Sequence, residues 1–129
     1  MPIRFEAYES GNYFISCWEG RVADPELIPS YSSFLNSSDW VPGMSELIDF
    51  SGIESPDVTH FGLINLAHYV NRVYVKQEPQ KAKVAVYSPR SEHTWMSVIY
   101  SAWFTGYKQQ ISVYRNIDEA VRWVIEQNN

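Results

Sequence analysis

Acidic, hydroxyl and imidazole side chains gather in the segment IESPDVTHFG, directly before the most regular helical pattern of the chain. Asp57, Thr59 and His60 could accept a proton, a phosphoryl group or a hydrogen bond from a partner. The same residue types are also ordinary helix-start residues, because Asp and Thr side chains accept hydrogen bonds from the backbone N–H groups of a first helical turn. Both interpretations are open at the level of sequence.

Polar residues follow two predicted strands, ELIDF and KVAVY. The candidate site residues of these two junctions are Asp49, Asp57, Thr59 and His60 in the first, which also holds Ser51 and Glu54, and Ser88, Arg90, Ser91 and His93 in the second, which also holds Glu92. Parallel strands end at one edge of a sheet, and the helices that begin there present unpaired backbone N–H groups. We therefore predict a binding site at this edge.

These polar residues match no catalytic or metal-binding motif. The chain lacks HExxH and paired-Cys spacing, a GxSxG elbow and a glycine-rich phosphate loop. A hydrolase with His60 or His93 as acid–base beside Asp57 or Arg90 is the less favoured alternative. The single cysteine, Cys17, forms no internal disulfide and has no neighbour that would activate it. The sequence predicts a protein that is not an enzyme, with no metal and no cofactor.

A second candidate site is the helical segment HTWMSVIYSAWF, whose apolar residues surround most of the helix. A helix that faces water on one side normally shows a polar stripe there. Trp95, Ile99 and Trp103 are therefore candidate ligand or interface residues. Burial in the core, burial in a homodimer interface and contact with a lipid or other apolar ligand are the three open interpretations, and we expect a homodimer.

Composition narrows the class of partner. The 129 residues carry a formal charge of −5, and their ten basic residues are scattered rather than clustered. Binding to a nucleic-acid backbone depends on concentrated Lys and Arg, so we expect no nucleic-acid partner. No segment reaches the length of a membrane span, and the N-terminus lacks a signal-like apolar run. We expect a cytoplasmic protein whose membrane contact, if any, is peripheral.

Strand-like and helix-like patterns alternate along the chain after an opening hairpin. The order β-β-α-β-α-β-α-β-α predicts one α/β domain over residues 1–129, with mostly parallel strands in a single sheet and helices packed on it. The predicted strands are 3–10, 13–20, 45–50, 83–88 and 109–115, and the predicted helices are 24–36, 59–75, 91–106 and 116–127.

Helix starts are marked by residues that commonly act as N-caps. Asp24, Thr59 or Asp57, Ser91 and Asn116 are the predicted caps of the four helices. Pro29 predicts that the first helix begins irregularly or becomes regular only after this residue.

The element order and the segment ELIDFSGIESPDVTHFGLINLA together resemble the anti-sigma-factor antagonist (STAS) domains and their SpoIIAA-like relatives. In STAS domains a strand ends in an aspartate, and an Asp-Ser-Ser-Gly-like stretch opens the next helix after a short loop. Asp57 matches the acid, and Thr59 matches the hydroxyl residue that a partner kinase phosphorylates. Val58 and His60 stand where that pattern has serine and glycine.

The C-terminal segments SAWFTG and ISVYRNIDEAVRWV are similar to the SpoIIAA-like branch, for which the resemblance implies ligand binding or association with a membrane surface. The resemblance therefore implies a non-enzymatic regulatory or interaction module. Its partner would be a protein, such as a regulatory kinase or a sigma-pathway protein, or a ligand at the strand-end edge. The alternative is a module that binds an apolar ligand, such as a lipid, or a membrane surface.

Overall fold

The structure is a computed structural model that describes residues 2–8, 10, 12–76, 82–104 and 110–126. The elements follow the predicted order, with a short 3-10 turn, η2, before α3. They are β1 (Ile3–Tyr8), β2 (Tyr13–Ala23), α1 (Asp24–Leu35), β3 (Ser45–Asp57), α2 (His60–Val75), β4 (Lys83–Tyr87), η2 (Ser91–His93), α3 (Thr94–Phe104), β5 (Gln110–Tyr114) and α4 (Ile117–Ile125).

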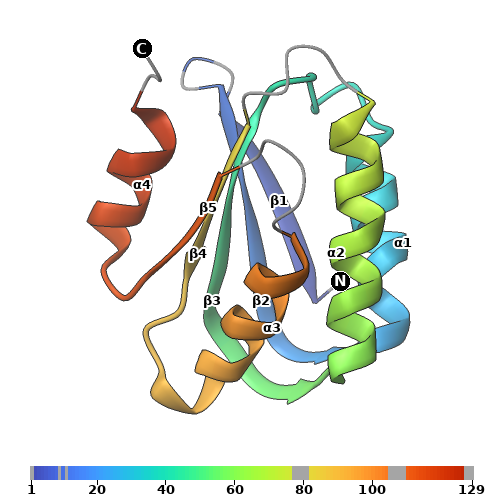
Figure 1. Cartoon of the computed structure of the whole chain (residues 1–129), viewed down its shortest axis with the longest axis vertical. Coiled ribbons are helices and arrows are strands. Elements are labelled where there is room, and N and C mark those ends of the chain that lie inside the picture. The colour runs from blue at the N-terminus through green and yellow to red at the C-terminus, as the bar shows by residue number, and fades with distance from the viewer. Residues whose placement is uncertain (1, 9, 11, 77–81, 105–109, 127–129) are drawn as a thin grey trace.

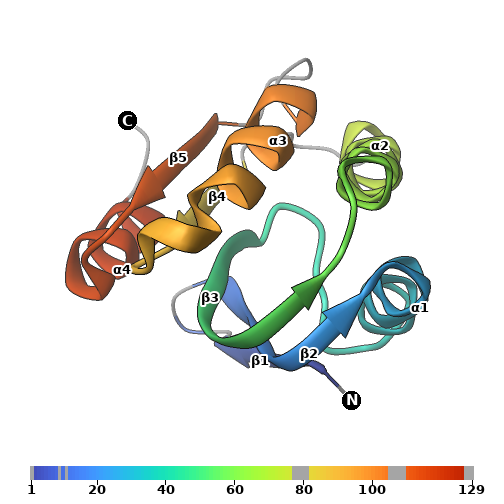
Figure 2. The ribbon, with the colours of Figure 1, turned by 90° about the horizontal axis from the view of Figure 1, so that it is seen from below.

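The five strands form one sheet in which each strand lies beside the strand that precedes it in the sequence. β1 pairs with β2 in the antiparallel sense, and all later pairs are parallel. Right-handed crossovers place the helices between successive parallel strands on one face. Figure 1 shows α1 and α2 on one side of the sheet and α4 on the other, and Figure 2 shows α1, α2 and α3 side by side.

Two apolar clusters hold the layers together. The larger lies between the sheet and α1, α2 and α3, and it includes the fully buried side chains of Trp18, Phe50 and Leu63. The smaller joins Leu47 and Ala85 of the sheet to α4 on the opposite face. Burial of one such large side chain stabilises a fold by roughly 1.5–3 kcal/mol, so the larger cluster dominates the stability.

β3 is longer than the sequence pattern predicted, because it continues beyond Phe50 to Asp57. Its partner β2 is equally extended and pairs with it up to Ala23 and Asp57, across two irregularities in register. β4 pairs with β3 only as far as Asp49, so the far half of β3 is paired on one side only. Pro56 is tolerated there because a missing N–H does not interrupt a ladder on the unpaired side.

Two of the four predicted helix caps are confirmed. Gly62 donates its N–H to Thr59 Oγ1 at 3.1 Å, and Glu119 donates its N–H to Asn116 Oδ1 at 3.1 Å. Asp24 is the first residue of α1 rather than its cap, and Ser91 opens the 3-10 turn without capping α3 through its side chain. The expected irregularity at Pro29 was also wrong, since α1 is continuous through it.

A buried lysine fixes the end of α4 on the sheet. Lys83 lies within the apolar strand β4, and its Nζ donates to the backbone oxygens of Trp123, at 3.0 Å, and Glu126. The ammonium group also lies 5.2 Å from the centre of the Trp123 ring. The cation therefore satisfies carbonyl groups at the helix C-terminus, where positive charge is favourable.

Candidate functional site

The predicted strand-end site is organised by a carboxylate from another helix. Thr59 is exposed at the start of α2, and its N–H and Oγ1 donate to the two oxygens of Asp24, at 2.8 and 2.6 Å. Asp57 forms a separate, exposed ion pair with Arg21, with Nε and Oδ2 3.1 Å apart. Asp57, the acid that the resemblance placed beside Thr59, thus pairs with Arg21, and Asp24, which was predicted only as a helix cap, contacts Thr59.

The Asp24 carboxylate lies at the N-terminus of α2, where the helix dipole and unpaired N–H groups favour a negative charge. Gly62 makes this approach possible, because a Cβ at this position would overlap the carboxylate. The position that an external anion would take at this helix start is therefore already occupied by a side chain of α1.

Asp49 does not join the other residues of the first junction. Its Oδ1 accepts hydrogen bonds from the N–H and Oγ of Ser51, at 2.8 and 2.6 Å. Side chains alternate across a strand, so Asp49 lies on the same face as Leu47, which is the face covered by α4. α2 and Thr59 belong to the layer on the other face.

The second junction, which follows β4, is held by hydrogen bonds to β3 and β5. Ser88 is buried and donates its N–H to Tyr114 O, and Arg90 Nη1 donates to Ile53 O at 3.1 Å. Ser91 is exposed, whereas His93, a candidate site residue, is buried, with only 4% of its surface exposed. These contacts tie the end of β4 to β3 and β5.

His60 contacts α3 rather than the acids of its own loop. Its ring lies 5.4 Å from Trp95, and two turns later the His68 ring lies 5.5 Å from Trp103. Within the described residues, no three His, Cys, Asp or Glu side chains form a group that could hold a metal ion. Of the residues of the hydrolase alternative, His60 contacts Trp95, Asp57 pairs with Arg21, and His93 donates its backbone N–H to Arg90 O.

The aromatic helix α3 is divided between core and surface. Met96 and Tyr100 are fully buried, and Trp95 and Ile99 are half-buried against α2. The outer surface carries apolar side chains from both helices, with Phe61 77% exposed, Val98 58% and Trp103 47%. We refer to Phe61, Val98 and Trp103, together with the half-buried Trp95 and Ile99, as the α2–α3 face.

The charges around this face differ from those of the whole chain. Neither α2 nor α3 contains an acidic residue, although the protein carries a net charge of −5. The outer surface of α2 instead exposes His60, His68, Arg72 and Lys76. The two helices of the α2–α3 face are therefore free of acidic residues, while the Asp24 carboxylate lies at the start of α2 and the exposed Glu92 precedes α3.

The sequence analysis did not predict a buried polar network that lies between the sheet and the helices α1, α2 and α3. Glu46 is fully buried, and its Oε2 accepts hydrogen bonds from Ser16 Oγ at 2.7 Å and from the Tyr31 hydroxyl at 2.6 Å. Three tyrosines lie near Glu46, one each from α1, α2 and α3: Tyr31, Tyr74 and Tyr100. Burial raises the pKa of each of the three hydroxyl groups, and the nearby charge of Glu46 raises it further.

Burial raises the pKa of Glu46 from 4.5 to about 7, although the hydrogen bonds from Tyr31 and Ser16 act in the opposite direction. The desolvation effect wins because a carboxylate in an apolar interior loses more hydration than two hydrogen bonds return. Alternation in SELIDF places Glu46 on the same side as Ile48 and Phe50, and that pattern is the signal from which its burial could have been predicted.

Known proteins resemble this chain in structure rather than in sequence. No protein-family model matches the chain, and a search of curated proteins finds no match. A solved structure that is similar is that of an uncharacterized protein of the DUF3478 family with a SpoIIAA-like fold, from Shewanella loihica PV-4. The two chains are 16% identical with a TM-score of 0.59, over 95% of this chain and 91% of that chain. The likeness confirms the fold predicted from the sequence.

Proposed function

We propose that this chain, which has a SpoIIAA-like fold, is a non-enzymatic interaction module that binds the surface of an anionic membrane through its α2–α3 face. The observation that carries the proposal is the exposure of Phe61, Val98 and Trp103 on two adjacent helices that contain no acidic residue. Contiguous exposed apolar side chains of this kind mark interaction surfaces, and Trp is favoured where apolar and aqueous phases meet.

The expected affinity is that of a reversible, peripheral contact. Transfer of the exposed part of each large side chain into the interface contributes roughly 1–2 kcal/mol, and each basic residue near an anionic surface contributes roughly 1 kcal/mol. Among the described residues, no helix is long and apolar enough to cross a membrane. The α2–α3 face would therefore lie on the membrane with its aromatic side chains at headgroup depth.

Val98→Asp tests the proposal. It removes an apolar contact and adds a negative charge, so we expect partition onto vesicles containing phosphatidylglycerol to fall by roughly 30-fold. Ile125→Asp is the matched control, because Ile125 is 46% exposed on α4, on the opposite face of the sheet. Co-sedimentation with vesicles, together with the melting temperature of each variant, measures the effect. Equal losses in both variants, or no binding by the unaltered protein, would reject a membrane contact at this face.

A homodimer that buries the same face gives a different result. In that case light scattering would show a dimer that Val98→Asp converts to a monomer, and vesicles would not bind. That outcome would replace the membrane with a second copy of the chain as the occupant of the α2–α3 face.

A second candidate function is regulation by a protein partner at the strand-end edge, and the exposed hydrogen bond between Thr59 and Asp24 favours it. If a kinase transferred the γ-phosphoryl group of ATP to Thr59 Oγ1, the hydroxyl proton would leave, with Asp24 Oδ2 as the nearest acceptor, and ADP would depart. The new charge of about −2 would repel Asp24 and break the contact between α1 and α2. A docked partner could then distinguish the two states.

Mass spectrometry tests this second function. After incubation with a bacterial lysate and ATP, we expect a phosphoryl group on Thr59 that is absent from Thr59→Ala. A reduced amount in Asp24→Ala, which keeps Thr59, would show that Asp24 assists the transfer. The Thr59→Ala protein controls for phosphorylation at other hydroxyl groups. An unmodified Thr59 in the unaltered protein would reject the phosphorylation switch.

A further inference from the structure

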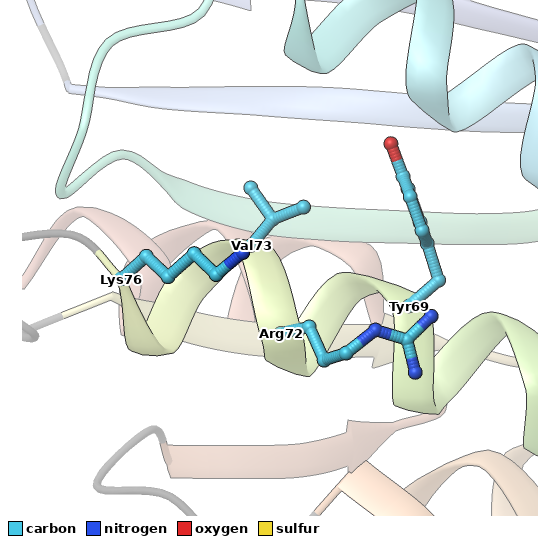
Figure 3. Close-up of a pocket in the computed structure, with 4 residues that line it drawn as sticks. All are labelled: Tyr69, Arg72, Val73 and Lys76. Atoms are coloured by element: carbon cyan, nitrogen blue, oxygen red, sulfur yellow. The ribbon is translucent and has the colours of Figure 1, made fainter.

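A small pocket lies on α2, with its apolar wall on the side of the helix that is turned away from α3. Its volume is about 240 Å³, and it is lined by Tyr69, Arg72, Val73 and Lys76, which occupy two successive turns of the helix. Figure 3 shows Tyr69 and Val73 projecting from the same side of α2, with the side chains of Arg72 and Lys76 along the helix next to them. The pocket thus combines an apolar wall with two cationic groups.

The two cations have no internal partner in the part of the chain that the structure describes. Arg72 and Lys76 are both exposed, and the ion pairs of the described residues involve only Arg4 and Arg21 as basic partners. Basic residues near a helix C-terminus are favourable on their own, but neither side chain donates to a terminal carbonyl among these residues. Among the described residues, no carboxylate neutralises either group.

The chemistry of the lining selects the kind of anion. A guanidinium group matches two oxygens of a phosphate in a bidentate arrangement, and a nearby ammonium group adds a second positive charge. The half-buried Tyr69 and Val73 form a wall against which the organic part of a phosphate ester can pack. A bare inorganic ion would leave that wall unused.

We propose that this pocket binds a phosphate ester, and that at a membrane the ester is the headgroup of an anionic phospholipid. The position of Arg72 at the edge of the pocket supports this assignment, because Arg72 follows His68 by one turn on the exposed side of α2, and His68 contacts Trp103 of the α2–α3 face. The lipid form of the inference rests on the proposed membrane function. The same pocket chemistry would also accept a soluble phosphate ester.

Arg72→Gln is the test, with Arg122→Gln on the exposed outer part of α4 as a charge-matched control. On vesicles containing phosphatidylglycerol, we expect Arg72→Gln to weaken binding about fivefold and Arg122→Gln to leave it unchanged. On vesicles of phosphatidylcholine alone, Arg72→Gln should match the unaltered protein. In parallel, glycerol 3-phosphate is titrated while the Tyr69 ring signals are followed by NMR.

The two arms separate this inference from the proposed function. If Arg72→Gln weakens vesicle binding and glycerol 3-phosphate does not shift the Tyr69 signals, the pocket binds a lipid headgroup. If glycerol 3-phosphate shifts the Tyr69 signals in an Arg72-dependent way and the protein does not bind vesicles, the pocket binds a soluble ester, and the membrane function is rejected. Vesicle binding that Arg72→Gln and Arg122→Gln weaken equally, with no Tyr69 shift, overturns the pocket while the membrane function stands. No binding in either arm overturns both.

Discussion

Replacement of Glu46 by glutamine is expected to raise the free energy of unfolding by about 3 kcal/mol at a pH of about 8, and to leave it nearly unchanged near pH 4.5. Burial raises the pKa of Glu46 to about 7 in the folded protein, so the folded state holds its proton more tightly than the unfolded state does. Glutamine keeps an oxygen for Ser16 and Tyr31 and never ionises.

The sign follows from proton binding. The stability that protonated Glu46 contributes is fully present below about pH 4.5, falls as the pH rises, and is lost once the pH exceeds about 7. Urea denaturation followed by tryptophan fluorescence at a series of pH values measures this loss. Glu54→Gln, at an exposed glutamate of β3, is the control and should keep the profile of the unaltered protein. Parallel profiles for the unaltered protein and Glu46→Gln would show that Glu46 does not titrate in this way.

Gly62→Ala is expected to destabilise the protein by about 2 kcal/mol, although alanine is the better helix former. The added methyl group would overlap the Asp24 carboxylate, which must then leave its position. Asp24 would lose its hydrogen bonds to the N–H and hydroxyl of Thr59. Hydrogen bonds to a charged group contribute roughly 1.5–3 kcal/mol, which exceeds the gain in helix propensity of up to about 1 kcal/mol.

The same substitution should change sign when the carboxylate is absent. In an Asp24→Ala background, Gly62→Ala no longer meets a clash, and we expect it to stabilise the protein by a few tenths to about 1 kcal/mol. Chemical denaturation of the four proteins of this cycle gives the coupling energy between the two positions. A destabilising effect of similar size in both backgrounds would show that the Asp24 contact is not its cause.

Local pattern was enough to predict the alternation of strands and helices and the caps at Thr59 and Asn116. These features depend on neighbours within a few residues, so a short segment of sequence is enough to predict them. The true length of β3 depends on pairing with β2, which lies about thirty residues earlier in the chain. The role of Asp24 likewise depends on Thr59, 35 residues away, and no local pattern reports such a contact.

The residues of the candidate site have partners that the local sequence does not reveal. Asp57, Thr59 and His60 are close together in sequence, yet they contact Arg21, Asp24 and Trp95 respectively. The apolar character of α3 was evident from its residues, but its division into a buried and an exposed half depends on where α2 packs. Tertiary packing therefore decides which residues of a motif act together.

The order of the strands has a consequence for how the protein is made. Because each new strand joins the sheet next to its predecessor, every pairing closes over a single hairpin turn or a single helical connection. The entropic cost of closing a loop rises with its length, so each of these closures costs less than pairing strands from opposite ends of the chain would. The β1–β2 hairpin can form first, and each later strand can add to the sheet's growing edge as it leaves the ribosome, without waiting for the C-terminus.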